Sequence, residues 1–498
     1  MFIVTLKTSS MMQEDTGGRK WAVMVSAFFV QFIICGITYS MGIFHVVFRH
    51  IFAGSHFDTS WISALLLHVT VISSVLFRFV TAKFGSRVSV MLGGLLSSIG
   101  LALGVCITEL YEIYLCMGVL TGIGFGIACS PSIVAVEQYF HRCRYQALST
   151  VLAGIGCGII VFPNFIRYLL EIYAWRGTLL LLSAITLNLC VCGAVMKPLK
   201  YEKEVQLLPL LSCMPLRNPL FYAMCIGNFF WSFGSTIIYI FLPSYALSMG
   251  TDFITATFLV SCIGMASFTS RVIFAFMGHN STLDDVTAIL CSVGLGAVIT
   301  GTCPLLFKHY SGQISYTLLF GFYSGFWTTF MSQVTRELLG PHYIAIGNGY
   351  LSFMIALGSL GAPCAALLIQ AEDEYTYAFY LAGACLLTSA TIMVLFKYRQ
   401  CGSPTHLTPS EHKTPLMNTS NGTATKCPDP TTTYRYYEED HMVMQKSGMY
   451  SLSASTETNP ELRDSHNKPE DVPTLIYKMW WNIFINIFNI IVSITQLR

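Results

Sequence analysis

The chain contains a long series of apolar stretches, and this feature limits its possible folds more than any other. An apolar stretch of about 20 residues is long enough to cross the hydrocarbon core of a bilayer. Twelve such stretches precede residue 400, at approximately 21–48, 59–81, 88–107, 111–137, 146–168, 176–196, 219–247, 253–277, 284–305, 314–335, 345–369 and 376–396. The sequence therefore predicts an all-α membrane protein with twelve transmembrane helices.

The composition excludes several classes of protein. Only 11% of the 498 residues are charged, whereas a soluble domain carries about 25%. The 28 Lys and Arg residues against 26 Asp and Glu leave a net charge of +2, which is too small to bind nucleic acid through its phosphates. The 17 cysteines have no metal-ligand spacing, so we interpret them as reduced, buried residues. The sequence has no phosphate-binding or dinucleotide-binding motif, so we expect neither an enzyme nor a cofactor.

Basic residues predict the orientation of the chain, because cytoplasmic loops carry an excess of Lys and Arg. The basic residues flank alternate stretches, at Arg19, Lys20, Lys83, Arg87, Arg142, Arg144, Lys197, Lys200, Lys203, Arg217, Lys397 and Arg399. The loops between these positions are poorer in basic residues. Both termini are therefore expected in the cytoplasm, which requires an even number of crossings.

The longest polar interruption divides the apolar stretches into two sets of six. We predict a cytoplasmic N-terminus at 1–20, a first six-helix half at 21–196, a central cytoplasmic loop at 197–218, a second half at 219–397 and a cytoplasmic tail at 398–498. The tail is polar enough to be mostly disordered. Apolar and Asn residues alternate at helical spacing over 475–495, which predicts an amphipathic helix on the inner leaflet. A thirteenth crossing is the alternative for this segment.

Arg271 is the charged residue placed deepest in an apolar stretch, in the sequence MASFTSRVIFAF. A charge at such a depth is costly and indicates function by default. A planar guanidinium can bind a carboxylate through two hydrogen bonds, so we interpret Arg271, with Ser267 on its polar flank, as the anchor of an anionic or zwitterionic substrate. The alternative is an ion pair between helices, but the neighbouring stretches contain no obvious carboxylate partner.

The other polar candidates fall into two groups. His68 lies in the second stretch and could relay a proton, contact the substrate or bond to a neighbouring helix. We place Tyr39, Asn228 and Trp327 beside it as substrate-binding candidates; Trp231, Tyr239, Tyr323 and Asn348 share this character. Charged residues near the cytoplasmic loops are interpreted as gating residues: Glu137, Arg142, Arg144, Lys83 and Arg87.

Two segments resemble known signatures. The turn TAKFGSRVSVMLGG resembles a loop signature of the major facilitator superfamily through Lys83, Gly85 and Arg87, with Ala82 in place of the usual acid. The segment YFHRCRYQALSTVLAG, from Tyr139, is similar to the fifth-span signature of monocarboxylate transporters. The similarity extends over about 15–400. It implies the major facilitator fold, transport across the plasma membrane by two rocking halves, and a single-span immunoglobulin chaperone of the basigin type as partner.

The resemblance also concerns the cargo. Three apolar phrases, including GVLTGIGFGIACSPSIVAV, resemble the creatine-carrying branch of this family, which implies creatine or guanidinoacetate as substrate. The proton-coupled lactate carriers place an Asp four residues before the conserved Arg and a Lys late in span 1; here Ser267 and Gly42 stand at those positions. We therefore favour facilitated diffusion. The alternatives are a proton-coupled symporter of lactate or pyruvate and, in another class, a polytopic channel or receptor.

Overall fold

The computed structural model describes residues 18–52, 54–140, 144–196, 215–277 and 294–401. All the described helices belong to one unit of the chain, within Met1–Ser403, and this part of the chain contains no β-strand. The side chain of Arg142 and the predicted terminal helix at 475–495 lie outside the described residues, as does most of the predicted tail.

The first half consists of helices that follow the predicted stretches closely. They are α2 (Arg19–Tyr39), α3 (Met41–Phe52), α4 (His56–Leu76), α5 (Arg78–Leu103), α6 (Leu110–Ile113), a π-helical segment (Tyr114–Leu120), α7 (Thr121–Tyr139) and α8 (Arg144–Val195). Helices α2 and α3 share the first predicted span. Helix α8 contains two predicted spans, because the backbone at Ala174 leaves the helical region with φ 53°. The chain reverses its direction there.

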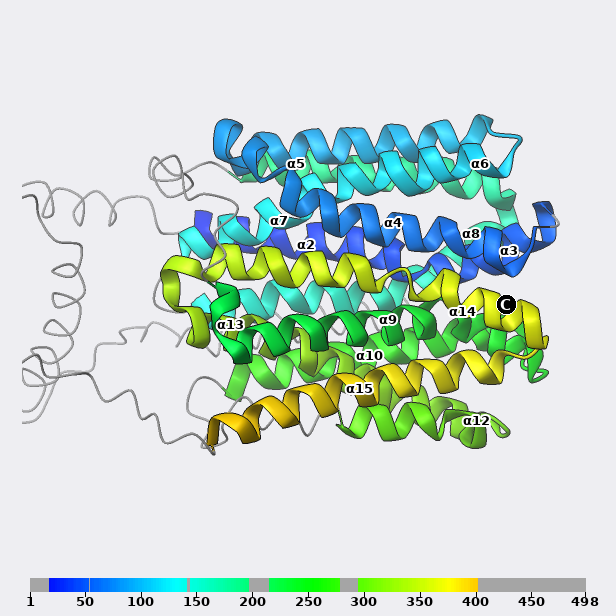
Figure 1. The fold of residues 1–498 in the computed structure, drawn as a ribbon. Coiled ribbons are helices and arrows are strands. Elements are labelled where there is room, and N and C mark those ends of the chain that lie inside the picture. Colours follow the sequence, from blue (N-terminus) through cyan, green and yellow to red (C-terminus); the bar gives the residue numbers. More distant parts are fainter. Residues whose placement is uncertain (1–17, 53, 141–143, 197–214, 278–293, 402–498) are drawn as a thin grey trace, which may run out of the picture. The chain divides into compact units, whose positions relative to one another are not determined.

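The second half contains the remaining helices. They are α9 (Pro219–Ser248), α10 (Phe253–Met277), α12 (Cys303–Leu306), α13 (Tyr310–Gly358), α14 (Gly361–Glu372) and α15 (Tyr375–Cys401). Helix α13 runs through the tenth predicted span and into the eleventh, and α14 completes the eleventh (Figure 1). The start of the ninth span, at 284–293, lies outside the described residues.

Nine helices or helix pairs in the described part of the chain are long and apolar enough to cross a membrane. The segment Gln146–Val195 is one of them and holds two of the predicted crossings. Together with the ranges above, these helices agree with an all-α membrane protein.

Two side-chain caps fix where the helices around the site begin. The Ser55 hydroxyl accepts a hydrogen bond of 3.1 Å from the Asp58 amide, and the Asp58 carboxylate accepts one of 3.3 Å from the Ser55 amide. This reciprocal pair starts α4. At the start of α9, the Asn218 side chain accepts from the Leu220 amide at 3.0 Å, and Pro219 occupies the first turn, where its missing N–H has no cost.

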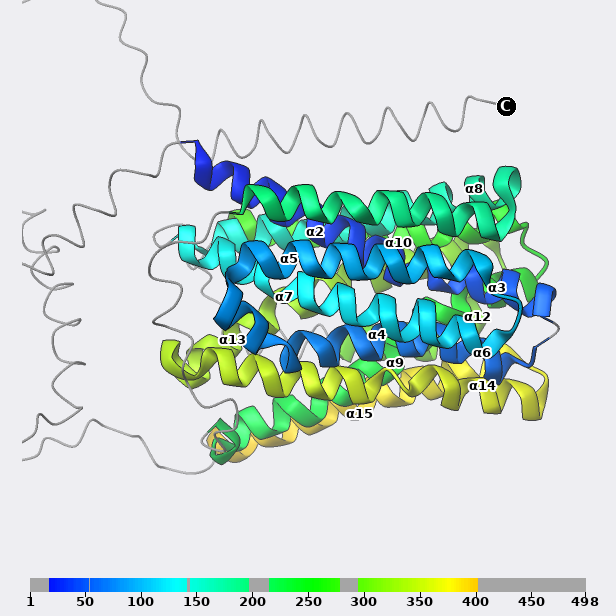
Figure 2. The same cartoon turned by 90° about the horizontal axis from the view of Figure 1, so that it is seen from above.

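The helical bundle has two ends. We call them the His56 end, with α3, α6, α12 and α14, and the Glu137 end (Figures 1 and 2). Near the His56 end, the ring of His45 lies 5.1 Å from that of Phe241, and the ring of His56 lies 5.4 Å from that of Tyr375. These pairs join α3 and α4 of the first half to α9 and α15 of the second. The His56 end is therefore closed.

Helices α8 and α10 pack closely enough to join the halves deeper in the bundle. A Cβ atom on Gly264 would lie 2.6 Å from the backbone nitrogen of Ile160, so only glycine permits this approach. Beside it, the Ser261 hydroxyl donates to the Ile160 carbonyl at 2.8 Å. Small residues and interhelical hydrogen bonds of this kind hold membrane helices together where lipid provides no hydrophobic drive.

Candidate functional site

Arg271 is buried between α10 and α13, with 3% of its surface exposed. Its Nη1 donates a hydrogen bond of 2.6 Å to the Ser267 hydroxyl, and its Nη2 donates one of 3.0 Å to the Thr328 hydroxyl. Its Nε atom is buried and has no hydrogen-bond partner. A guanidinium carries five N–H donors, so the two bonds leave donors available for a further acceptor.

No carboxylate compensates this charge within the described residues. The ion pairs found there are Glu137 with Arg144 and Arg167 with Glu171, and neither includes Arg271. The titratable side chains that interact with its charge are Tyr239, Tyr39, Cys35 and Cys157. Tyrosine and cysteine side chains are both predominantly neutral near pH 7. A buried cation without a fixed anion is unfavourable, so the site is electrostatically suited to an anionic group that arrives from outside.

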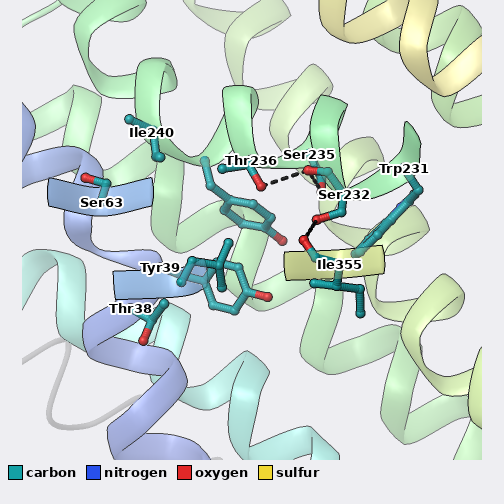
Figure 3. A pocket seen from close by; sticks show the side chains of 11 residues that line it. Thr38, Tyr39, Ser63, Trp231, Ser232, Ser235, Thr236, Ile240 and Ile355 are labelled. Carbon is teal, nitrogen blue, oxygen red and sulfur yellow. Dashed lines mark hydrogen bonds between the residues drawn. The ribbon is translucent and has the colours of Figure 1, made fainter. Parts of the chain in front are cut away.

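A small cavity lies between the two halves, and Figure 3 shows its lining. Helices α2 and α4 contribute one wall, and α9 and α13 contribute the other; the lining residues are Thr38, Tyr39, Ser63, Leu67, Trp231, Ser232, Ser235, Thr236, Tyr239, Ile240 and Ile355. Its volume is about 30 Å³, which suffices for one or two water molecules. The cavity in this conformation is therefore too small for an organic substrate.

Tyr39 and Tyr239 connect the cavity to Arg271, because both line the cavity and both interact with the charge of Arg271. Their ring centroids lie 4.5 Å apart, with one tyrosine on each half. The Tyr239 hydroxyl lies 3.2 Å from that of Ser324. The Ser324 hydroxyl already donates to the Gly321 carbonyl at 3.0 Å, so Tyr239 is the donor of the pair.

The comparisons with known proteins identify the fold and the family. Residues 25–363 match the model of the Major Facilitator Superfamily. The chain is 30% identical over 411 residues to monocarboxylate transporter 13 of Bos taurus, covering 81% of this chain and 95% of that protein. It is 28% identical over 411 residues to monocarboxylate transporter 12 of Xenopus laevis, covering 76% and 89%, respectively. It is also 28% identical over 397 residues to monocarboxylate transporter 11 of Homo sapiens, covering 76% and 83%.

The chain belongs to the monocarboxylate transporter family of the major facilitator superfamily. It is a membrane solute transporter and not an enzyme, and its similarity to monocarboxylate transporter 12 agrees with the resemblance found in the sequence. Its twelve predicted spans and two halves agree with the fold of the superfamily.

Two positions distinguish the transporter from the proton-coupled pattern described above. Ser267 is in direct contact with Arg271, where that pattern has an acid. Gly42 lies against α9, and a Cβ atom there would lie 2.7 Å from the Tyr239 carbonyl oxygen and 2.8 Å from that of Ile240. A lysine side chain at position 42 does not fit while the His56 end is closed.

Asn228 and Trp327 contact each other within the second half of the transporter. The indole Nε1 of Trp327 donates to the Asn228 side-chain oxygen at 3.3 Å, and the Asn228 amide donates to the Leu351 carbonyl at 3.1 Å. Trp327 also stacks on Trp231 with ring centroids 5.6 Å apart. Neither Asn228 nor Trp327 lines the cavity. They lie directly behind Trp231, which does.

His68 joins the two halves through a hydrogen bond. Its Nδ1 lies 2.6 Å from the Ala356 carbonyl oxygen and 3.3 Å from the Ser359 hydroxyl. Because a carbonyl oxygen only accepts, Nδ1 carries the proton and donates it. This contact ties α4 to α13, which makes His68 part of the packing between the halves.

The predicted gating residues that the structure describes, Glu137, Arg144, Lys83 and Arg87, lie at the Glu137 end. Glu137, near the end of α7, pairs with Arg144 at the start of α8, so this ion pair lies within the first half. Lys83 and Arg87 are exposed on α5. Between them, Gly85 adopts φ 84°, a backbone conformation that other residues rarely reach. The helix is therefore kinked at Gly85, with Lys83 before the kink and Arg87 after it.

The sequence interpretation missed Thr328 and the cavity hydroxyls of Thr38, Ser63, Ser232, Ser235 and Thr236. Single Ser and Thr residues are common in apolar helices, and most of them can satisfy their hydroxyl on the local backbone, as Thr38, Ser235 and Thr236 do. The only available signal was the helical spacing of Ser232, Ser235, Thr236 and Tyr239, which places all four on one side of α9.

Proposed function

We propose that this transporter carries a small carboxylate or zwitterion, with creatine or guanidinoacetate favoured, by facilitated diffusion across the plasma membrane. The single observation that carries the proposal is the buried guanidinium of Arg271, which has no carboxylate partner among the described residues. A substrate carboxylate bound to the remaining N–H groups would supply the missing negative charge.

The residues around the anchor support a carrier without proton coupling. A proton-coupled carrier needs a group that changes its charge when the substrate binds. Ser267 contacts Arg271 but does not titrate, and Gly42 has no side chain. Creatine brings its own cation and needs no lysine from the protein to neutralise it. A proton-coupled lactate or pyruvate symporter remains the second candidate, supported by the family.

The transport cycle is proposed to be alternating access, in which the two halves rock about a central site. The closed His56 end and the small cavity between the halves are the features of one closed conformation. Opening would separate Tyr39 from Tyr239 and expose Arg271. By the distribution of basic residues, the Glu137 end faces the cytoplasm together with both termini. A basigin-like chaperone is proposed as partner from the family resemblance alone.

Uptake of labelled creatine into oocytes tests this function. Cells that express the transporter should accumulate creatine, and Arg271→Ala should abolish uptake while the surface amount, measured by biotinylation, stays unchanged. Normal uptake by Arg271→Ala would exclude the anchor role. Preloaded unlabelled creatine should accelerate entry of the label, which a carrier allows and a channel or receptor does not. A panel with lactate, carnitine, thyroid hormone and aromatic amino acids would identify another cargo.

A further inference from the structure

We infer that the cavity between α2, α4, α9 and α13 binds the guanidinium end of a zwitterionic substrate while Arg271 binds its carboxylate. This inference rests on the proposed function and adds which pole of the substrate each site receives. It is carried by the hydrogen bonds that the cavity hydroxyls already make.

The hydroxyl protons on α9 are already engaged inside the protein. Ser232 donates to the Ile355 carbonyl at 2.8 Å, Ser235 donates to the Ser232 carbonyl at 3.2 Å, and Thr236 donates to the same carbonyl at 2.7 Å. Figure 3 shows these three side chains on one wall of the cavity. A hydroxyl has one donor and two acceptor lone pairs, so each presents only acceptors to a ligand.

The opposite wall has the same character. Thr38 donates to the Ile34 carbonyl at 2.8 Å, and Ser63 donates to the Met41 carbonyl at 3.4 Å. The indole Nε1 of Trp231 is buried and has no hydrogen-bond partner among the described residues, so it is the one N–H donor of a lining side chain that is unpaired there. The Tyr39 hydroxyl makes no hydrogen bond with the described residues, so it can accept from a ligand or donate to one. The cavity therefore offers acceptors from both halves and is suited to a ligand that donates.

Aromatic rings and the lack of acidic side chains select the type of donor. Tyr39, Tyr239 and Trp231 line the cavity, and no Asp, Glu, Lys or Arg is among the described residues that line it. Aromatic faces attract cations. A guanidinium is planar and more weakly hydrated than an ammonium group. It therefore loses less hydration free energy when it enters a site that has no carboxylate. A primary ammonium would lose more hydration for the same set of neutral acceptors.

The two sites lie near each other, because Tyr39 and Tyr239 line the cavity and lie within electrostatic range of Arg271. When the halves separate, the hydroxyls of α2 and α4 leave those of α9. A substrate that bridges them would hold both halves through its cationic end. The cavity thus explains how one ligand can contact both halves during the cycle.

A matched pair of ligands tests the inference. Guanidinoacetate and N-carbamoylglycine share the carboxylate and a planar head, but the head of the first is a cationic donor, whereas that of the second is neutral and presents a carbonyl acceptor. Inhibition of labelled creatine uptake should require at least about tenfold less guanidinoacetate, as expected for hydrogen bonds to a charged group. Equal inhibition by both compounds would overturn the inference.

Variants of the cavity wall locate the effect. Thr236→Val keeps the shape of the side chain and removes its hydroxyl acceptor. Ser235→Ala removes the hydroxyl acceptor of the preceding residue. Each should weaken inhibition by guanidinoacetate severalfold and leave inhibition by N-carbamoylglycine unchanged. Ser315→Ala is the control, since the exposed Ser315 hydroxyl bonds only to its own helix. Equal weakening of both compounds would show a structural role and overturn the inference.

The outcome also separates this inference from the proposed function. If creatine uptake depends on Arg271 but the two compounds inhibit equally, the carrier function stands and the cation site is wrong. If no labelled creatine enters and preloading has no effect, the proposed function fails, and the cation site fails with it.

Discussion

The guanidinium of Arg271 donates a 2.6 Å hydrogen bond to the hydroxyl of Ser267, one helical turn earlier on α10. A hydroxyl accepts this bond without neutralising the charge, so the guanidinium remains available to an incoming carboxylate. The same position occupied by an acid would hold a fixed counter-ion against the anchor. We therefore expect the affinity for the substrate carboxylate to depend on whether residue 267 is neutral or acidic.

Ser267→Asp should lower creatine uptake at neutral pH by at least about tenfold, the equivalent of about 1.4 kcal/mol. The new carboxylate would form an ion pair with Arg271 and compete with the substrate. Ser267→Asn is the matched control, because it supplies an acceptor of similar size without charge and should retain most of the uptake. The measurement is initial uptake normalised to surface amount. Equal uptake by the two variants would contradict the anchor role.

Creatine uptake should change by less than about twofold between mildly acidic and neutral medium, because the residue that contacts the Arg271 anchor on α10 is Ser267, which carries no titratable acid. His68→Ala removes the hydrogen bond to Ala356. It should change the rate of uptake by loosening the contact between the halves, while the pH profile stays flat. A steep acid stimulation that disappears in His68→Ala would instead identify His68 as a proton carrier.

The sequence predicted the helices well because the bilayer imposes their length. The break at Ala174 lies in the predicted gap between the fifth and sixth stretches. The pairing of α8 with α10, by contrast, depends on Gly264 and Ile160 facing each other. The sequence of neither segment indicates which helix it packs against. The division of the first span at Ser40 and the π-helical segment Tyr114–Leu120 also have no periodicity signal.

Prediction of the site was limited in the same way. Arg271 was recognisable because a buried charge is rare. Thr328 was not, since it lies far along the chain on α13 and resembles many other threonines in apolar helices. The cavity depends on which Ser and Thr residues meet across the halves. Which of them meet is determined by the packing of α2 and α4 against α9, and this packing cannot be predicted from the sequence of either helix.

The ion pair between Glu137 and Arg144 predicts the outcome of a charge exchange. Glu137→Lys should lower uptake severalfold, because it places like charges at the junction of α7 and α8. The double variant with Arg144→Glu should recover most of the loss. The two side chains are partly exposed, and ion pairs near the surface contribute roughly 0.2–1 kcal/mol, so the fold itself should survive. The same exchange at Arg167 and Glu171, which form a 2.6 Å ion pair within α8, is the control and should leave uptake unchanged. No recovery in the double variant would argue against a role for the pair.

Gly42 should be necessary for closing the His56 end. A Cβ atom at this position would lie 2.7 Å from a backbone oxygen of α9, and tightly packed backbones cannot yield locally. Gly42→Ala should therefore lower maximal uptake severalfold by favouring conformations in which the halves are apart at this end. Gly294→Ala is the control, since a Cβ atom there meets nothing within 4 Å. A cysteine introduced by Ser63→Cys, in the cavity wall, should react faster with an external thiol reagent in the Gly42→Ala background than with Gly42 intact. The same rate in both backgrounds would mean that Gly42 does not control closure.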